Sequence, residues 1–305
     1  MTHKKPILVT GASSGIGNHL VHYLAQRGHG VYATVRNKND YTALENIENI
    51  TPLLMDVRNS QQISDAIEII QQNGHGLYGV VNNAGIGELG FLSTWTDEEM
   101  FNIFDVNVFG PHRVTNACMD LLLTSQGRIV TIGSQGGIIT SKMYGPYTMT
   151  KHAMEAYTDA LSEELKPFGV HVSIVQPGGI ITNVGVNSFE KFVSHLERAR
   201  PPFDIEAKQI LASFNTPRED RSNEPESATN RKPSSPEIVS AAVYDALFSQ
   251  NPKLRYLVGT HWEGNRVIDT LIKKLLEEND NPQHNYSRDE LVAIMDKLIS
   301  ERRTK

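Results

Sequence analysis

The segment Ile7-Leu8-Val9-Thr10-Gly11-Ala12-Ser13-Ser14-Gly15-Ile16-Gly17 decides the fold of this chain. Its first four residues are apolar or β-branched and follow Pro6, which indicates a short buried strand. Three glycines form a turn, and Leu20, Val21 and Leu24 then recur at helical spacing. A strand, a glycine-rich turn and a helix in this order suit a phosphate group, because the backbone can approach it and the helix N-terminus offers free N–H groups. The spacing G-x-x-x-G-x-G differs from the standard G-x-G-x-x-G fingerprint, so a tight structural turn is the alternative.

Strand-like apolar runs alternate with amphipathic helical runs along most of the chain. We expect seven strands, at residues 7–10, 31–35, 52–56, 77–81, 128–132, 170–175 and 254–258. Such alternation predicts an α/β fold with a doubly wound, parallel, Rossmann-type sheet. In such a sheet the ligand crevice lies at the carboxyl ends of the strands.

The end of the second expected strand bears on the choice of cofactor. Val35 and Arg36 stand there, with Lys38 nearby. In a dinucleotide site, an acidic residue at this place would hydrogen-bond the 2′-hydroxyl of the adenosine ribose. An arginine can instead bind a 2′-phosphate through two hydrogen bonds. We therefore expect NADP(H) in preference to NAD(H), and a solvated loop arginine is the alternative.

Tyr147 and Lys151 are four residues apart, so on a helix they project from one face. Free tyrosine titrates near pH ~10, and a neighbouring ammonium lowers that pKa. The pair is therefore a plausible acid/base at neutral pH, although many such pairs merely lie on a solvated face. Asn107 stands in an otherwise apolar helical run, where asparagine has poor propensity. It is either a satisfied core group or a site residue.

Composition excludes several classes of function. The net charge of −6 argues against a nucleic-acid partner held by bulk electrostatics. The single cysteine, Cys118, cannot form an intrachain disulfide, which suits a reducing compartment. We expect no transmembrane segment, because no apolar run approaches ~20 residues, and no signal peptide, and hence a cytoplasmic protein. The eleven histidines form no metal-binding motif, so no metal is expected.

The chain resembles the short-chain dehydrogenase/reductase (SDR) family, in its single-domain branch. The motifs that carry the resemblance appear in family order: Thr10-Gly11-x-x-x-Gly15-Ile16-Gly17, Asn82-Asn83-Ala84-Gly85, Asn107, Ser134, Tyr147-x-x-x-Lys151 and Pro177-Gly178. Asn107 to Ser134 spans 27 residues and Ser134 to Tyr147 spans 13, both typical of the family. Tyr144 does not match the motif, because position 148 is threonine. Residues 31–36 and 252–259 further resemble the 17β-hydroxysteroid and retinol dehydrogenase group, many of whose members use NADP(H).

The resemblance implies an NADP(H)-dependent oxidoreductase that interconverts a secondary alcohol and a carbonyl, like a carbonyl reductase or a hydroxysteroid dehydrogenase. It implies that Tyr147 is the proton donor or acceptor and that Lys151 lowers its pKa and binds the nicotinamide ribose. Ser134 would hydrogen-bond the substrate oxygen, and Asn107 would anchor a water that links Lys151 to solvent. The implied cofactor-binding residues are Gly11, Ser13, Ser14, Gly15, Ile16, Gly17, Arg36, Asp56, Val57, Asn83, Ala84, Gly85, Tyr147, Lys151, Pro177, Gly178, Ile180 and Thr182.

The resemblance also organises the rest of the chain. We expect one domain over residues 1–305, with its core in 5–183 and 235–259, a substrate-covering lobe in 184–234 and a helical tail in 260–305. Apolar side chains of the lobe, such as Phe189, either line a substrate pocket or pack the lobe onto the core. Residues 217–233 are polar, which indicates a mobile loop. The further candidates for substrate contact are Gln135, Met143 and Tyr144.

The family commonly forms dimers or tetramers, so we expect a homo-oligomer that acts on a small carbonyl or alcohol. The end of the tail is peripheral or an oligomer contact. Two other classes of protein share this fold. One is a catalytically silent NADP(H)-binding or sensing protein, against which the complete Asn-Ser-Tyr-Lys set argues. The other is a related lyase or dehalogenase, which is expected to lack the glycine-rich loop that this chain keeps.

Overall fold

The computed structural model describes residues 4–182, 188–216 and 220–303. The expected boundary of the lobe, at 183 and 184, and the start of the expected loop, at 217–219, lie outside the described residues. The chain forms two compact units, Met1–Gly264 and Asn265–Lys305, and each is described by itself.

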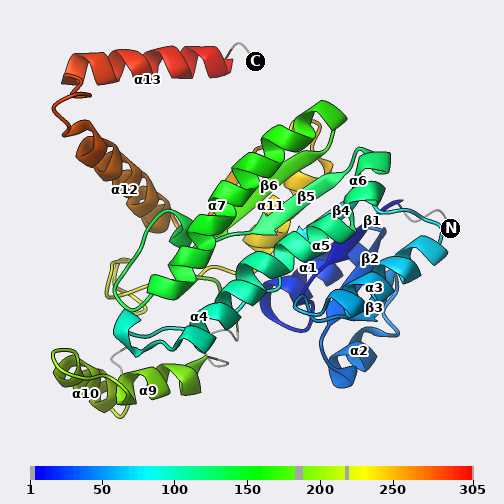
Figure 1. Ribbon diagram of the computed structural model, residues 1–305, viewed down its shortest axis with the longest axis horizontal. Helices are drawn as coiled ribbons and strands as arrows, with labels where there is room; N and C mark the ends of the chain where they lie inside the picture. Colours follow the sequence, from blue (N-terminus) through cyan, green and yellow to red (C-terminus); the bar gives the residue numbers. More distant parts are fainter. Residues whose placement is uncertain (1–3, 183–187, 217–219, 304–305) are drawn as a thin grey trace. The chain divides into compact units, whose positions relative to one another are not determined.

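The first unit is built on one seven-stranded parallel sheet of order β3-β2-β1-β4-β5-β6-β7, which confirms the predicted fold (Figure 1). The order reverses between β1 and β4, and this reversal creates the switch point where ligands bind in doubly wound sheets. The strands are β1 Lys4–Val9, β2 His29–Val35, β3 Ile50–Leu54, β4 Gly79–Asn82, β5 Arg128–Ile132, β6 His171–Pro177 and β7 Arg255–Val258.

Helices cover both faces of the sheet. Because successive strand residues point to opposite faces, Ile7 and Val9 join one apolar core and Leu8 joins the other. The first core lies under α1 (Gly15–Ala25), α2 (Lys38–Leu44) and α11 (Glu237–Phe248). The second lies under α3 (Ser60–Gln72), α5 (Gly110–Ala117), α6 (Met119–Ser125) and α7 (Gly145–Leu165), the layer in front in Figure 1.

Local sequence signals start several of these helices. Thr96 and Glu99 form a capping box at the start of α4 (Asp97–Phe104). Asn59 caps α3, and its side chain accepts the Gln62 N–H. The apolar helical run around Asn107 does not form one continuous α-helix, because residues Asp105–Phe109 form a π-helical turn before α5 begins.

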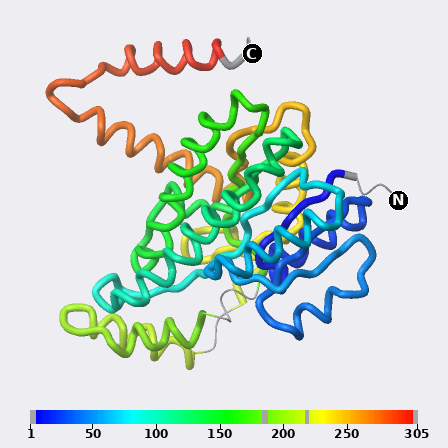
Figure 2. The backbone as a smooth tube through the Cα atoms, turned by 45° about the vertical axis from the view of Figure 1, so that its right-hand side comes forward, coloured from blue at the N-terminus to red at the C-terminus, as the bar shows by residue number. Residues whose placement is uncertain are grey.

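The lobe after β6 consists of α9 (Phe189–Glu197) and α10 (Asp204–Ser213), which lie beside α4 in Figures 1 and 2. Leu196 and Ala207 are buried against Phe91 in a third, smaller apolar cluster. Within residues 220–234 the structure contains no helix or extended strand, as expected for this polar stretch. Hydrogen bonds within the stretch nevertheless stabilise it, since the Asn230 amide donates to the carbonyls of Arg221, Glu224 and Pro225.

The second unit holds most of α12 (His261–Asn279) and all of α13 (Arg288–Arg303). Both helices of the tail expose apolar side chains, among them Leu271 and Leu275 on α12 and Met295 and Leu298 on α13. Among the described residues, no helix combines the length and the apolar character that crossing a bilayer requires.

Candidate active site

Ser134 and Tyr147 meet at the carboxyl end of β5. Ser134 follows this strand after Gly133, and Tyr147 stands in the first turn of α7. The Ser134 hydroxyl hydrogen-bonds the phenolic oxygen of Tyr147, and its Oγ accepts the Gly136 N–H at 2.9 Å. The structure thus brings together two side chains that are 13 residues apart in sequence.

Lys151 lies one turn further along α7, on the same side of the helix. Its side chain is buried, and Nζ lies 5.7 Å from the centroid of the Tyr147 ring. Nζ donates to the backbone carbonyl of Ile132, at the end of β5, at 2.8 Å. The ammonium is therefore held by the sheet, close to the phenol ring.

The protonation of this pair differs from the expectation based on spacing. Removal from water raises the pKa of Tyr147, and the hydrogen bond from Ser134 only partly opposes this rise. Burial lowers the pKa of Lys151 from its ordinary value of 10.5 to about 8. The expected lowering of the tyrosine pKa by Lys151 is thus wrong for this structure, because burial disfavours charge on both groups. At neutral pH Tyr147 keeps its proton.

Replacement of Lys151 by Met should raise the free energy of unfolding at pH 7. The ammonium is charged there and buried, and an apolar side chain of similar length removes that burden. Between pH ~8 and pH ~10.5 the unfolded wild-type chain binds this proton more than the folded chain does, so the wild type gains stability with rising pH. The difference in the free energy of unfolding between the variant and the wild type should therefore be smaller at pH 10 than at pH 7. Urea unfolding of both proteins at pH 7 and pH 10 measures it, and a less stable variant at pH 7 would contradict the expectation.

Asn107 is buried in the π-helical turn, and both polar atoms of its side-chain amide form hydrogen bonds. Its Oδ1 accepts the Ile86 N–H at 2.8 Å, and its Nδ2 donates to the Ile86 carbonyl at 2.9 Å. Nδ2 also donates to Thr150 Oγ1 at 3.1 Å, and Thr150 in turn donates to the carbonyl of Tyr147. Asn107 therefore links the segment after β4, the π-helical turn and the turn of α7 that carries Tyr147.

The glycine-rich turn is packed tightly against the segment after β4. Gly11 has φ +68°, in the left-handed region that favours glycine. A Cβ placed on Gly17 would overlap the carbonyl oxygen of Gly11 and the amide of Asn83. The Asn83 amide donates to the carbonyls of Thr10 and Gly11, and Thr10 Oγ1 accepts the N–H groups of Asn83 and Ala84. Two expected cofactor motifs, residues 11–17 and 83–85, thus form one rigid unit.

The N-terminus of α1 is free of side-chain caps. Ser14 occupies the N-cap position without a side-chain hydrogen bond to the helix, and the first turn holds no acidic residue. The side chains of Ser13 and Ser14 are exposed, whereas Ile16 is half-buried. α2, α3 and α4 are each capped by a side chain, whereas α1 shares the lack of a side-chain cap with α7, α9, α10 and α11. The first N–H groups of α1 are therefore left for an anion.

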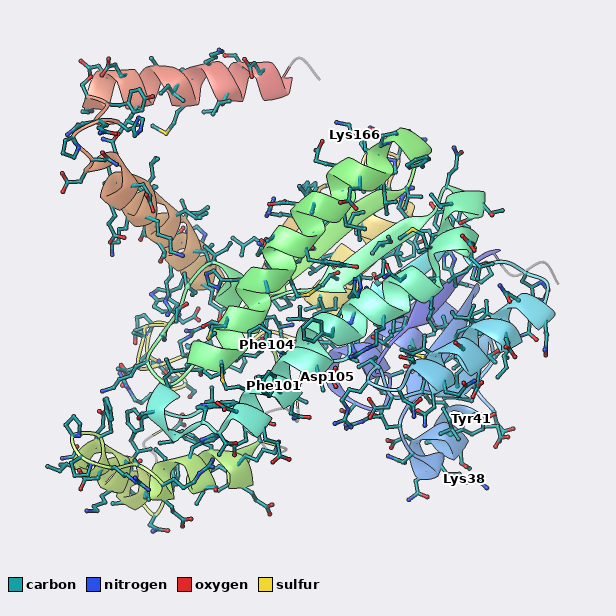
Figure 3. The ribbon with its side chains drawn as sticks, in the orientation of Figure 1. Lys38, Tyr41, Phe101, Phe104, Asp105 and Lys166 are labelled. Carbon is teal, nitrogen blue, oxygen red and sulfur yellow. The ribbon has the colours of Figure 1, made fainter. Side chains whose placement is uncertain are left out.

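The residues expected around the adenosine lie at the ends of β2 and β3. Arg36 is exposed, and Lys38 lies in the first turn of α2 (Figure 3). Asp56 lines an open cleft, whereas Val57 is buried. Arg58, which the sequence patterns did not single out, pairs with the Asp56 carboxylate at 2.7 Å. Its guanidinium hydrogen bonds hold the pKa of Asp56 below the usual range.

The segment after β6 runs from Pro177 to Thr182. Pro177 ends the strand and is buried, and the Gly178 N–H donates to the Val258 carbonyl at 2.9 Å. Ile180 is half-buried. Thr182 reaches the glycine-rich turn, since a Cβ placed on Gly15 would lie 3.3 Å from Thr182 Cγ2. The segment therefore connects the end of β6 with the cofactor loop.

The four expected substrate-contact residues lie in different settings. Gln135 is buried, and its amide donates to the Val258 carbonyl at 3.3 Å. Met143 has φ +67° and packs with the third apolar cluster. Tyr144 is 42 % exposed and precedes α7. Phe189 is 46 % exposed at the start of α9, with its ring centroid 5.1 Å from that of Phe214. Tyr144 and Phe189 thus keep accessible surface, whereas Gln135 is engaged in packing.

Known proteins are similar to this chain in sequence and in fold. The profile of the short chain dehydrogenase family matches residues 5–192. An uncharacterized oxidoreductase of Escherichia coli, YbbO, is 32 % identical over 85 % of this chain and 91 % of its own length. Retinol dehydrogenase 7 of Rattus norvegicus is 31 % identical over 84 % of this chain and 80 % of its own length.

Solved structures share the fold at lower identity. A short chain dehydrogenase from Burkholderia cenocepacia, in complex with NADP, superposes with a TM-score of 0.66 at 21 % identity. The match covers 92 % of this chain and 100 % of that one. The 3-ketoacyl-(acyl-carrier-protein) reductase from Brucella melitensis, complexed with NADH, gives a TM-score of 0.67 at 21 % identity, over 85 % and 98 % of the two chains.

Proposed function

The chain belongs to the short-chain dehydrogenase family and is an oxidoreductase, and from this premise we propose that it interconverts a carbonyl and a secondary alcohol with NADP(H). The observation that carries the proposal is the contact between Ser134 and Tyr147, with Lys151 one turn away, at the carboxyl end of β5. These side chains stand at the edge of the sheet where doubly wound folds bind their ligands.

The residues present fit a nicotinamide dinucleotide. The N–H groups at the start of α1 receive no side-chain cap, which suits a pyrophosphate. The packing of Gly17 against Gly11 brings the helix close to the turn. An open cleft beside Asp56 offers room for an adenine. In the proposed site, the phosphates and the adenosine are bound by residues 11–17 and 83–85. Arg36 binds the 2′-phosphate. Ile180 and Thr182 bind the nicotinamide amide.

Proton transfer is the task of this chain's own side chains. The bound cofactor supplies or accepts the hydride. Tyr147 donates its phenolic proton to the substrate oxygen in carbonyl reduction, and its raised pKa keeps that proton in place at neutral pH. Ser134 donates a hydrogen bond to the same oxygen and stabilises the charge that develops there. Lys151 lies beside the Tyr147 ring and binds the cofactor ribose. Asn107 anchors a water that links Lys151 to solvent, and through this water the proton that Tyr147 donates is replaced.

A substrate panel tests the proposal. The intact protein is incubated with NADPH or NADH and with ketones, aldehydes, hydroxysteroids and retinoids, and turnover is followed by nicotinamide absorbance. We expect turnover of at least one carbonyl class. Tight NADPH binding with no turnover across the panel would favour the catalytically silent binding protein instead.

Exchange of Val35, the buried last residue of β2, and of Arg36, which follows it, should change the cofactor preference. In a protein with Val35→Asp and Arg36→Ser together, the new carboxylate can accept a hydrogen bond from a 2′-hydroxyl and repels a 2′-phosphate. We expect the ratio of kcat/KM for NADPH to that for NADH to fall by about 100-fold, the equivalent of ~2.7 kcal/mol. A matched variant, Lys38→Ser, should reduce the ratio less. An unchanged ratio in the double variant would rule out Arg36 as the phosphate ligand.

The setting of the enzyme is also part of the proposal. The described part of residues 184–234 is proposed to cover the substrate, since Phe189 offers exposed aromatic surface there.

A cytoplasmic location is supported by Cys118, a buried free thiol, and cell fractionation tests it. Self-association as a dimer or tetramer is supported by the exposed apolar side chains of Phe101, Phe109 and Met149 (Figure 3 labels Phe101). Light scattering tests it, and a monomer mass would contradict it.

A further inference from the structure

A buried glutamate at the start of α12 holds the backbone that follows β6. Glu263 is 1 % exposed, and its Oε1 accepts the Gly179 N–H at 2.8 Å. Its Oε2 accepts the Thr260 N–H at 3.2 Å, while Thr260 Oγ1 accepts the N–H of Glu263 at 3.2 Å. Thr260 and Glu263 thus form a capping box. One carboxylate fixes both the start of a helix and the strand-end segment.

The surrounding backbone is shaped around this carboxylate. A Cβ placed on Gly178 or on Gly259 would overlap Glu263 Oε2. The same two Cβ positions would lie 2.7 and 2.9 Å from the Gln135 amide, which places Glu263 beside the residue that follows Ser134. The Glu263 carboxylate therefore fills the space between the three segments that follow β5, β6 and β7 at the carboxyl edge of the sheet.

Arg231 of the polar loop pairs with the Glu263 carboxylate, and its Nε also lies 3.9 Å from Glu226 Oε1. Its Nη2 donates to Glu263 Oε1, and its guanidinium lies 4.8 Å from the Trp262 ring. The same loop grips the strand-end segment directly, since the Ser234 N–H donates to the Gly179 carbonyl at 2.8 Å and the Ile181 N–H donates to the Ser234 carbonyl at 2.9 Å. The loop and Glu263 thus hold Gly179 by its carbonyl and its N–H respectively.

The pairing with Arg231 and the hydrogen bonds from Gly179 and Thr260 offset the cost of burying the Glu263 carboxylate. The backbone it holds continues into Ile180 and Thr182, the expected neighbours of the nicotinamide amide. We propose that Glu263, with Arg231, is the positioning residue for residues 178–182 and thereby sets the affinity for the nicotinamide end of the cofactor. This inference rests on the proposed function.

Two ligands separate the nicotinamide end from the rest of the cofactor. The dissociation constants of NADPH and of adenosine 2′,5′-bisphosphate, which lacks the nicotinamide half, are measured by calorimetry on the full chain. In Glu263→Ala the Gly179 N–H loses its acceptor, so we expect NADPH binding to weaken at least about tenfold. Binding of the bisphosphate should change less than about twofold. Glu263→Gln keeps an acceptor and should recover part of the loss, and Arg231→Met should weaken NADPH binding as Glu263→Gln does.

Glu99 provides the matched control. It stands at the same position of a capping box, with Thr96, and also pairs with an arginine, Arg198, at 2.8 Å. Glu99→Ala should lower Tm without changing the affinity for NADPH. If the Glu263 variants lower Tm but leave NADPH affinity unchanged, Glu263 is only a helix cap and the inference fails. It also fails if both ligands weaken equally.

Failure of the proposed function has a different signature. A wild-type chain that binds neither ligand would overturn the proposed function together with this inference, whereas a wild type that binds NADPH with unaffected Glu263 variants overturns only the inference. If Glu263→Ala does not fold, Glu263→Gln and Arg231→Met still decide the question, because each keeps the volume of the site.

Discussion

Replacement of Tyr147 by Phe should lower kcat by about 1,000-fold, within the range that loss of a positioned general acid produces. The phenyl ring keeps the packing of α7 but carries no proton to donate, and Ser134 loses its partner on the phenolic oxygen. The dissociation constant for NADPH should stay within about twofold. Stopped-flow single turnover and a binding titration measure the two quantities separately.

The matched control is Tyr157→Phe on the same helix. Tyr157 stands ten residues further along α7, where its ring packs against the second apolar core. Loss of that hydroxyl should leave kcat within about threefold. If Tyr147→Phe retained wild-type turnover, another group would be the acid and the assignment of Tyr147 would be withdrawn.

The second large effect is expected from Gly17→Ala. The added Cβ would overlap the carbonyl oxygen of Gly11 and the amide of Asn83, so α1 must move away from the turn and the Asn83 hydrogen bond to Gly11 must lengthen. We expect the NADPH dissociation constant to rise at least about 30-fold, and the free energy of unfolding to fall by ~1–3 kcal/mol, as overpacked sites do.

Gly264→Ala is the matched control for this substitution, because a Cβ there would have no atom within 4 Å. Alanine in that helical position should be neutral or stabilise by up to ~1 kcal/mol. Calorimetric titration and thermal unfolding of both variants check the contrast. An unchanged NADPH affinity in Gly17→Ala would remove the glycine-rich turn from the cofactor site.

The sheet was predictable because short-range patterns determine it. Apolar runs bounded by glycine and proline predicted seven strands, and the structure has seven in one parallel sheet. The fifth strand has the expected bounds, whereas the others shift by one to three residues at an end. β6, for example, continues to Pro177, because its ladder with β7 extends to the pair of Pro177 and Val258. Such cross-strand pairing is not visible in a single run of sequence.

The site was only partly predictable. Motif spacing identified Ser134, Tyr147 and Lys151, and the structure brings them together. Spacing reveals the charge of a neighbour but not the loss of water around it, so the direction of the Tyr147 pKa was predicted wrongly. Glu263 was missed because its partner Gly179 is 84 residues away in sequence. Its one local signal, the threonine three residues before it, indicates a helix start and nothing about cofactor binding.

The π-helical turn at Asp105–Phe109 makes the length of this region indispensable. The Gly110 N–H donates to the carbonyl of Asp105, five residues earlier, so the turn contains one residue more than an α-helix would. Removal of one residue here would restore ordinary α-helical bonding and rotate α5 by about 100° relative to α4. The buried face of α5 would then turn towards solvent, and Asn107 would lose its place beside Ile86. Substitution of side chains around Asn107 should therefore disturb the site less than a change in the number of residues in this turn.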